Sequence, residues 1–122
     1  MKLNILSVDD SKAVLKYIEW VFSKVDHEVR TVSGGKQAIK FLQSPEGQGI
    51  DLILLDWEMP PPDGLEVLRE FKKLGIKIPV AMLTSKNNES DIREALSLGV
   101  EEFIMKPFTP ELLIEKIEEI CS

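Results

Sequence analysis

Residues 51–56 have the sequence Asp-Leu-Ile-Leu-Leu-Asp, in which four consecutive apolar residues lie between two aspartates. An unbroken apolar run of this length is typical of a strand that helices cover on both faces of a parallel sheet. Similar short runs occur on either side of it, and longer segments with helical spacing of apolar residues separate them. The predicted strands are Leu3–Val8, Glu28–Ser33, Asp51–Leu55, Pro79–Thr84 and Glu102–Met105.

Start and stop signals divide the segments between and after these strands into five helices. The first helix is expected from Ser11, and the second is expected around Ala38, ending at Pro45 and Gly47. The other three begin at capping residues, and glycines close two of them. Their predicted caps and ends are Asp63 with Glu66 and Gly75, Asn88 with Asp91 and Gly99, and Thr109 with Pro110.

The alternation of five strands and five helices predicts one α/β domain. Right-handed crossovers turn such a chain into a doubly wound parallel sheet, with its ligand site at the carboxyl ends of the strands. Polar and apolar residues alternate in Glu28–Ser33, so this strand is expected at the edge of the sheet. The length of 122 residues leaves no room for a second domain, and we assign residues 1–122 to a single unit.

The composition excludes several classes of protein. Fifteen Lys and Arg residues against 21 Asp and Glu residues give a net charge of −6, which disfavours binding to nucleic acid. The longest uncharged stretch, Ile78 to Ser85, is far too short to span a bilayer, and no signal peptide precedes Leu3. The single cysteine, Cys121, can form neither an internal disulfide nor a thiolate metal cage. We therefore expect a cytoplasmic protein that has no contact with membranes.

Polar residues lie at the carboxyl ends of four predicted strands. They are Asp9 and Asp10, Asp56, Thr84 and Ser85, and Lys106. Three carboxylates in one pocket repel one another unless a cation lies between them, and hard oxygen ligands favour Mg²⁺. Taken alone, the Asp9-Asp10 pair could equally serve only to begin a helix.

The two adjacent acids also bear on the kind of ligand. Flavodoxin-like and dinucleotide-binding sheets place small residues after the first strand to cradle a phosphate, and two carboxylates there would repel FMN or NAD. An aspartate can instead act as a nucleophile toward phosphorus when a metal and a cation neutralise the transferring group. Asp56, at the end of a central strand, is the candidate nucleophile, with Lys106 as the cation and Thr84 as a hydrogen-bond donor.

Four segments of the chain resemble the receiver domain of bacterial two-component response regulators. Each is weak alone, but their order and spacing together are specific. The segments are Val8-Asp9-Asp10-Ser11, Leu54-Leu55-Asp56-Trp57-Glu58-Met59-Pro60 with Asp63-Gly64 behind it, Leu83-Thr84-Ser85, and Phe103-Ile104-Met105-Lys106-Pro107-Phe108. The resemblance implies a flavodoxin-like (βα)₅ fold with strand order 2-1-3-4-5.

The resemblance also assigns roles to individual residues. It implies that Asp56 accepts a phosphoryl group, that Mg²⁺ is the cofactor, and that the Lys106–Pro107 peptide bond is cis. Asp10, Asp56 and the backbone carbonyl of Glu58 would hold the Mg²⁺, and Asp9 would assist through water. Thr84 and Lys106 would bind the phosphoryl oxygens, and the implied switch residues are Thr84, Phe103 and Pro107.

A receiver of this kind takes its phosphoryl group from a sensor histidine kinase or a histidine phosphotransfer protein. We expect it to dephosphorylate itself slowly and to signal to a downstream protein rather than to nucleic acid. The predicted output surface comprises Glu89–Leu98, the fifth strand and Pro110–Ile120. We expect a stand-alone module, because the 122 residues leave none for a DNA-binding or enzymatic output domain, and a receiver cut from a longer chain is the equal alternative. The position of Met1 directly before the first strand favours the natural amino terminus.

Two other functions compete with this interpretation. A Mg²⁺-dependent phosphohydrolase of the haloacid dehalogenase type needs a second Asp two residues after its nucleophile, where this chain has Glu58, and it needs a cap domain. A pseudo-receiver binds partners without phosphorylation, but it lacks one of the acids or the lysine, all of which are present here.

Several further residues carry weaker signals. We expect His27 to be a solvated surface residue, and Trp20 and Trp57 to serve packing or partner contacts. An ion pair between Glu58 and Lys86 is expected to overhang the site and to change the lifetime of the phosphoryl group. The loop Met59–Gly64 departs from the family pattern because it has three consecutive prolines, which restrict φ and disfavour helix.

Overall fold

Five strands and five α-helices alternate along the chain in a computed structural model that describes residues 1–122. All five predicted strands and all five predicted helices are present, with ends that differ from the expected ones by a residue or two. A short 3₁₀-helix, Pro45–Gly49, occupies the segment expected to end the second helix. The elements are β1 Asn4–Val8, α1 Lys12–Ser23, β2 Glu28–Val32, α2 Gly35–Leu42, β3 Leu52–Asp56, α3 Gly64–Lys73, β4 Val80–Thr84, α4 Glu89–Ser97, β5 Glu102–Met105 and α5 Pro110–Cys121.

The strands form one parallel sheet in the order β2-β1-β3-β4-β5, as the resemblance implied. All five residues of β3 are buried, which agrees with its unbroken apolar sequence. The side chains of β2 are only partly buried or exposed, which agrees with its predicted place at the edge. The register pairs Val8 with Leu55 and Asp56 with Leu83, so β1, β3 and β4 end side by side.

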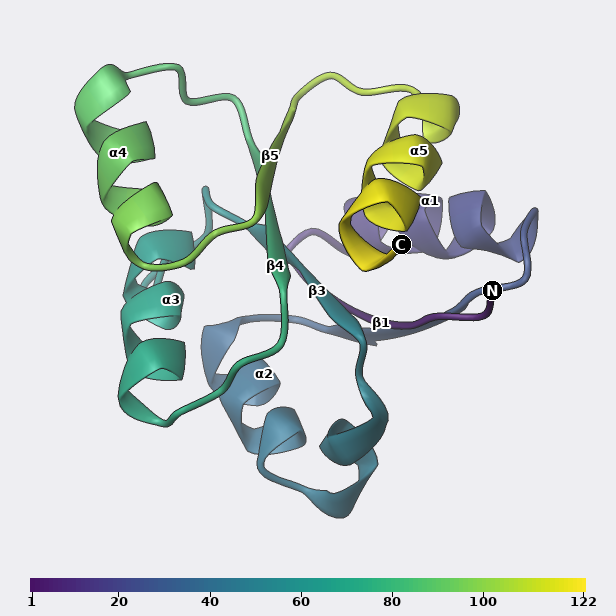
Figure 1. Cartoon of the computed structure of the whole chain (residues 1–122), viewed down its shortest axis with the longest axis horizontal. Helices are drawn as coiled ribbons and strands as arrows, with labels where there is room; N and C mark the ends of the chain where they lie inside the picture. Colours follow the sequence, from purple (N-terminus) through teal and green to yellow (C-terminus); the bar gives the residue numbers. More distant parts are fainter.

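Helices cover both faces of the sheet (Figure 1). Helices α1 and α5 lie on one face, and α2, α3 and α4 lie on the other. Successive side chains of a strand point to opposite faces, so the strands supply two separate apolar clusters. Leu55, Met82 and Phe103 pack on the side of α2, α3 and α4, whereas Leu54 and Ile104 pack on the side of α1 and α5. None of the helices combines the length and the apolar character needed to cross a membrane.

The helix ends follow the predicted signals with one exception. The Asp63 side chain accepts a hydrogen bond from the Glu66 N–H, and the Glu66 carboxylate accepts one from the Asp63 N–H, which completes the capping box. Gly75 and Gly99 have φ values of 72° and 96°, a conformation that glycine adopts without strain. The capping box expected at Asn88 is wrong in its second half, because the Asp91 carboxylate pairs with Lys86.

His27 contradicts its predicted place on the surface. Its ring lies between the start of β1 and helix α5 because the short α1–β2 loop carries it under that helix, and the residue is only 8% exposed. Its Nδ1 accepts a hydrogen bond from the Leu3 N–H at 3.0 Å, and its Nε2 lies 2.8 Å from the Glu118 carboxylate. Since Nδ1 accepts, Nε2 carries the proton and donates to Glu118. His27 is therefore a structural link between β1 and α5.

Replacing His27 with alanine is expected to lower the free energy of unfolding by about 1 to 3 kcal/mol, because the buried Leu3 N–H loses its acceptor. Glu118→Ala should cost less, about 1 kcal/mol or below, since the Glu118 side chain is 43% exposed. Urea denaturation of the two variants measures both values. Equal stability of His27→Ala and wild type would show that the ring contributes nothing to the fold.

Candidate functional site

The candidate site lies where β1, β3, β4 and β5 end. Asp9 follows β1, Asp56 ends β3, Thr84 ends β4 and Lys106 follows β5. The parallel register brings these four positions to one edge of the sheet, and backbone hydrogen bonds extend the pairing beyond the strands. The Lys106 N–H donates to the Thr84 carbonyl, for example, which holds the segment after β5 against the end of β4.

The three predicted acids form one cluster. Carboxylate oxygens of Asp9, Asp10 and Asp56 all lie within 4.8 Å of one another, with Asp9 and Asp56 buried and Asp10 exposed. A role in beginning the helix accounts for only one oxygen of Asp9, which accepts a hydrogen bond from the Ser11 N–H at 2.9 Å. Ser11 is the residue that caps α1, and one oxygen of buried Asp9 has no hydrogen-bond partner. An unpartnered buried carboxylate oxygen is costly unless a ligand uses it.

Crowding changes the protonation of these acids. Burial raises the pKa of Asp56 to about 6, and the negative charges of Asp9 and Glu58 add to this, while Lys106 acts against it. The pKa of Asp9 is also raised, mainly by burial, although the Ser11 N–H hydrogen bond opposes the shift. The cluster therefore carries a surplus of negative charge that a cation would relieve.

Lys106 is the cation that the structure itself supplies. Its Nζ lies 2.5 Å from Asp56 Oδ1 and 3.8 Å from Glu58 Oε1. Burial alone would lower the pKa of Lys106, but the hydrogen bond and the charge of Asp56 outweigh it and raise the pKa. The predicted cis bond between Lys106 and Pro107 is present, and a second cis bond, Pro61–Pro62, was not expected from the sequence.

Glu58 has different partners from those predicted. Its carboxylate accepts hydrogen bonds from the hydroxyl of Thr84, at 2.6 Å, and from the backbone N–H and the hydroxyl of Ser85, at 3.1 and 3.2 Å. The expected Glu58–Lys86 ion pair is wrong. Lys86 pairs with Asp91 at 3.7 Å and places its ammonium group 5.5 Å from the centre of the Trp57 ring. Glu58 and Lys86 each lie two residues beyond the end of a strand, but the directions of their side chains decide which donors Glu58 reaches.

The aromatic residues near the site form a stacked pair. The rings of Trp57 and Phe103 lie 6.4 Å apart with an angle of 26° between their planes. Trp57 is buried, in agreement with a packing role, whereas Trp20 is 52% exposed. Phe103 is only partly buried and lies on the same face of the sheet as α4.

Comparison with known proteins identifies the family. The family model described as "Response regulator receiver domain" matches residues 5–118. The chain belongs to this family. The response regulator SaeR of Staphylococcus epidermidis is 35% identical over 98% of the chain, and the match covers 50% of SaeR. SaeR of Staphylococcus aureus is 32% identical over 98% of the chain. The chain thus spans about half the length of the curated relatives it matches.

Solved receiver structures confirm the fold. The receiver domain of the Francisella response regulator 1452 has a TM-score of 0.87 at 26% identity, and the match covers 97% of this chain and 95% of that one. A CheY-like receiver domain protein of Methanospirillum hungatei has a TM-score of 0.86 at 27% identity, with 98% and 93% covered. The flavodoxin-like (βα)₅ fold that the resemblance implied is therefore correct.

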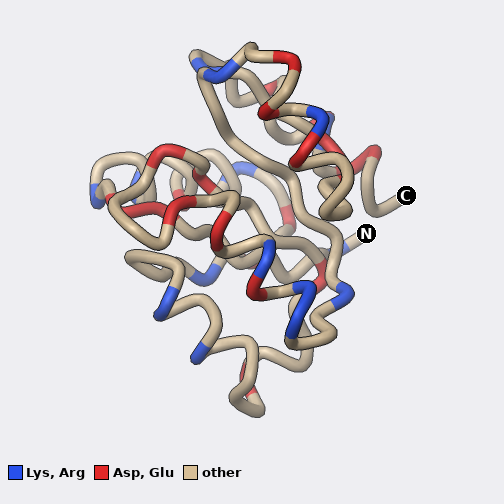
Figure 2. Tube along the Cα trace, turned by 90° about the vertical axis from the view of Figure 1, so that its left-hand side faces the viewer, with Lys and Arg blue, Asp and Glu red and all other residues tan.

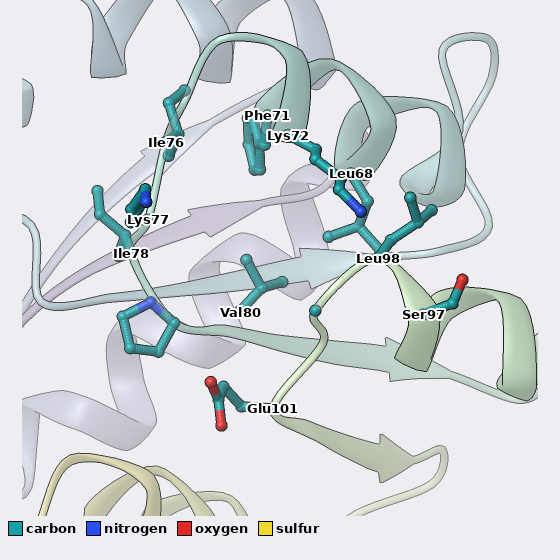
Figure 3. A pocket seen from close by; sticks show the side chains of 12 residues that line it. Leu68, Phe71, Lys72, Ile76, Lys77, Ile78, Val80, Ser97, Leu98 and Glu101 are labelled. Carbon is teal, nitrogen blue, oxygen red and sulfur yellow. The ribbon is translucent and has the colours of Figure 1, made fainter.

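A cleft of about 270 Å³ lies on the receiver domain away from the acids (Figure 3). It is formed by the end of α3, the start of β4 and the end of α4, with Leu68, Phe71 and Val80 among its apolar lining residues. Because residues 76–79 precede β4, Val80 is its first residue and Glu101 directly precedes β5, the cleft is at the amino edge of the sheet. It is not part of the site formed by Asp56 and Lys106.

The raised pKa of Asp56 predicts a pH-dependent gain in stability for Asp56→Asn. A carboxyl group with a raised folded-state pKa favours folding below its ordinary value of 3.8, and this contribution is lost as the pH rises through about 6. At about pH 8 without divalent ions, the variant should unfold at a higher urea concentration. The gain in the free energy of unfolding is at most about 3 kcal/mol, and the loss of the charged partner of Lys106 reduces it. The gain should shrink as the pH falls toward about 4. A variant less stable than wild type at both pH values would contradict the inferred cost of burying a charged Asp56 carboxylate.

Proposed function

We propose that this receiver domain accepts a phosphoryl group on Asp56 from a phosphohistidine of a sensor histidine kinase or a histidine phosphotransfer protein. The observation that carries the proposal is the arrangement around the Asp56 carboxylate. It is buried beside two further carboxylates, and Lys106 contacts one of its oxygens. Family membership supports a histidine kinase as the donor.

In the proposed transfer, an oxygen of the Asp56 carboxylate forms a bond to phosphorus as the phosphorus–nitrogen bond of the donor histidine breaks. The electron pair of that bond returns to the imidazole, which takes up a proton, and the product is an aspartyl phosphate. Lys106 is close enough to Asp56 to counter the charge of the phosphoryl oxygens. The Thr84 hydroxyl, at the end of the neighbouring strand, is the proposed donor to one of them.

The residues present fit a bound Mg²⁺. Three carboxylates lie within reach of a single ion, and a buried oxygen of Asp9 lacks a partner. Asp10, Asp56 and the backbone carbonyl of Glu58 would hold the ion, with Asp9 assisting through water. When bound, Mg²⁺ supplies the positive charge that lets an anionic phosphoryl group approach these acids.

Two alternatives are less well supported. A phosphohydrolase needs an acid and base two residues after the nucleophile, and the Glu58 side chain is bound instead to Thr84 and Ser85. A pseudo-receiver lacks one of the acids or the lysine, and this chain has them clustered. We therefore propose a signalling module that catalyses its own phosphorylation and slow dephosphorylation, without turning over a separate substrate.

The proposed output is a change in the surface formed by α4, β5 and α5. Thr84 ends β4 and pairs in register with Met105 of β5. Phe103 lies two residues before Met105, so the side chains of Thr84, Phe103 and Met105 all point to the face covered by α4. A movement of Thr84 toward the phosphoryl group would leave space that Phe103 can enter, and a partner reads the altered surface through different affinities for the two states.

Charge favours a downstream protein, rather than nucleic acid or a membrane surface, as the partner. Acidic and basic segments are interspersed on the side of the molecule seen in Figure 2. Helix α5 carries Glu111, Glu115, Glu118 and Glu119 against a single lysine, Lys116, which pairs with Glu102. An acidic surface of this kind repels phosphate backbones. We propose a location in the cytoplasm, where histidine kinases present their phosphohistidine.

The test is incubation with acetyl phosphate and Mg²⁺, followed by measurement of the intact mass. The expected result is a gain equal to a single phosphoryl group, which a chelator prevents because the three carboxylates then stay unscreened. Acetate leaves in this reaction as its bond to phosphorus breaks. An unchanged mass with Mg²⁺ present, or an equal gain with and without chelator, would contradict the proposal.

A further inference from the structure

Four hydrogen-bond donors or cations converge on the Glu58 carboxylate. The Thr84 hydroxyl donates to one oxygen, and the N–H and hydroxyl of Ser85 donate to the other. The Lys106 ammonium lies 3.8 Å from that second oxygen. These contacts lower the pKa of Glu58 although burial alone would raise it. The ends of β4 and β5 thus form a receptor for an oxyanion, and an anion of the chain itself occupies it.

The same donors are needed at Asp56. The Lys106 ammonium contacts Asp56 as well as Glu58, so it lies between the two carboxylates. A phosphoryl group on Asp56 would bring further acceptor oxygens to this position. The Thr84 hydroxyl is fully buried and has a single hydrogen to donate. Thr84 therefore cannot serve the Glu58 carboxylate and a phosphoryl oxygen at the same time.

We propose that Glu58 is an internal competitor for the phosphoryl site. Its carboxylate holds Thr84, Ser85 and Lys106 in the unphosphorylated protein and leaves them when the phosphoryl oxygens arrive. This inference rests on the proposed function, because it takes Asp56 as the phosphoacceptor. The Glu58 side chain is 35% exposed, so it can turn into solvent and regain hydration when it is displaced.

Two consequences follow from the competition. Glu58 slows phosphorylation of Asp56, because the hydrogen bonds of Glu58 must break before Thr84, Ser85 and Lys106 can reach the incoming phosphoryl group. Glu58 also draws Thr84 and Ser85 toward the site in the absence of phosphate. The start of the β4–α4 loop is therefore partly ordered before any signal arrives.

The first experiment measures the contacts of Glu58 without any phosphorylation. In Glu58→Ala, the Ser85 N–H loses its acceptor, and its hydrogen exchange measured by NMR should become roughly tenfold faster. Asp91→Asn is the matched control, because Asp91 is an acid near the site whose carboxylate contacts Lys86 and none of the four groups. Unchanged exchange of Ser85 in Glu58→Ala, or equal acceleration in the control, overturns the inference.

The second experiment measures the rate at which acetyl phosphate with Mg²⁺ modifies each chain. Glu58→Ala should react on the order of tenfold faster than wild type, since it lacks a charge-assisted competitor for the donors. Asp91→Asn should stay within about twofold of wild type. Equal rates for wild type and Glu58→Ala, or equal acceleration in both variants, overturn the competition but leave the proposed function standing. If none of the three chains is modified, the proposed function itself fails.

Discussion

A chain carrying Asp56→Asn gains no phosphoryl group from acetyl phosphate and Mg²⁺ under conditions that modify the wild type fully. The carboxamide is not nucleophilic toward phosphorus, and the substitution also removes the negative charge that pairs with Lys106 and that would hold the metal. The fold should survive, since the change relieves repulsion inside the acidic cluster. Intact-mass measurement after a fixed incubation records the loss, with circular dichroism as a check on folding.

Asp51→Asn is the matched control for this prediction. Asp51 directly precedes β3, at the other end of the strand that Asp56 closes, and its carboxylate accepts a hydrogen bond from the Asn4 N–H. The same chemical change there should leave the mass gain intact. Stoichiometric modification of Asp56→Asn would show that another carboxylate accepts the phosphoryl group, and the assignment would be wrong.

Replacing Phe103 with alanine is expected to separate phosphorylation from signalling. Phe103 stacks on Trp57, the residue after Asp56, and shares a sheet face with Thr84, and its apolar ring can neither ligate a metal nor donate to the phosphoryl oxygens. Phosphorylation of Asp56 should therefore stay within about twofold of wild type. The coupling to α4, β5 and α5, on the order of 1 to 3 kcal/mol in such switches, should largely disappear. Hydrogen exchange with and without phosphorylation measures this coupling over residues 84–120.

Phe41→Ala provides the control for a lost phenylalanine ring. Phe41 is also partly buried, but it lies on α2, where Arg30 covers its ring. Its variant should keep the phosphorylation-dependent exchange changes in residues 84–120. A Phe103→Ala protein that responds like wild type would remove Phe103 from the signalling route.

The sequence predicts the fold well because its apolar runs and caps are local signals. Leu52–Leu55 could be assigned to a central strand from four residues, and Asp63 with Glu66 determined the start of α3. The cluster of Asp9, Asp10, Asp56 and Lys106 was also predictable, since parallel strands bring their carboxyl ends together. Such predictions need only the strand assignments and the rule that orders the strands.

Contacts that depend on side-chain direction could not be predicted in the same way. His27 is a single polar residue in a loop, and only the path of that loop beneath α5 makes it buried. Glu58 could have been placed against Thr84, because β3 and β4 are neighbours, but its choice of Thr84 and Ser85 over Lys86 depends on rotamers. The cis bond at Pro61–Pro62 had no signal beyond the run of prolines.

The most direct test of the central proposal is to locate the phosphoryl group within the wild-type chain. After incubation with acetyl phosphate and Mg²⁺, the protein is cleaved and its peptides are sequenced by tandem mass spectrometry, with the acyl phosphate kept intact by rapid work under acidic conditions. The added mass is predicted on the peptide that contains Asp56, and on that residue within it. Location of the phosphoryl group on Asp9, Asp10, His27 or any residue other than Asp56 would contradict the account.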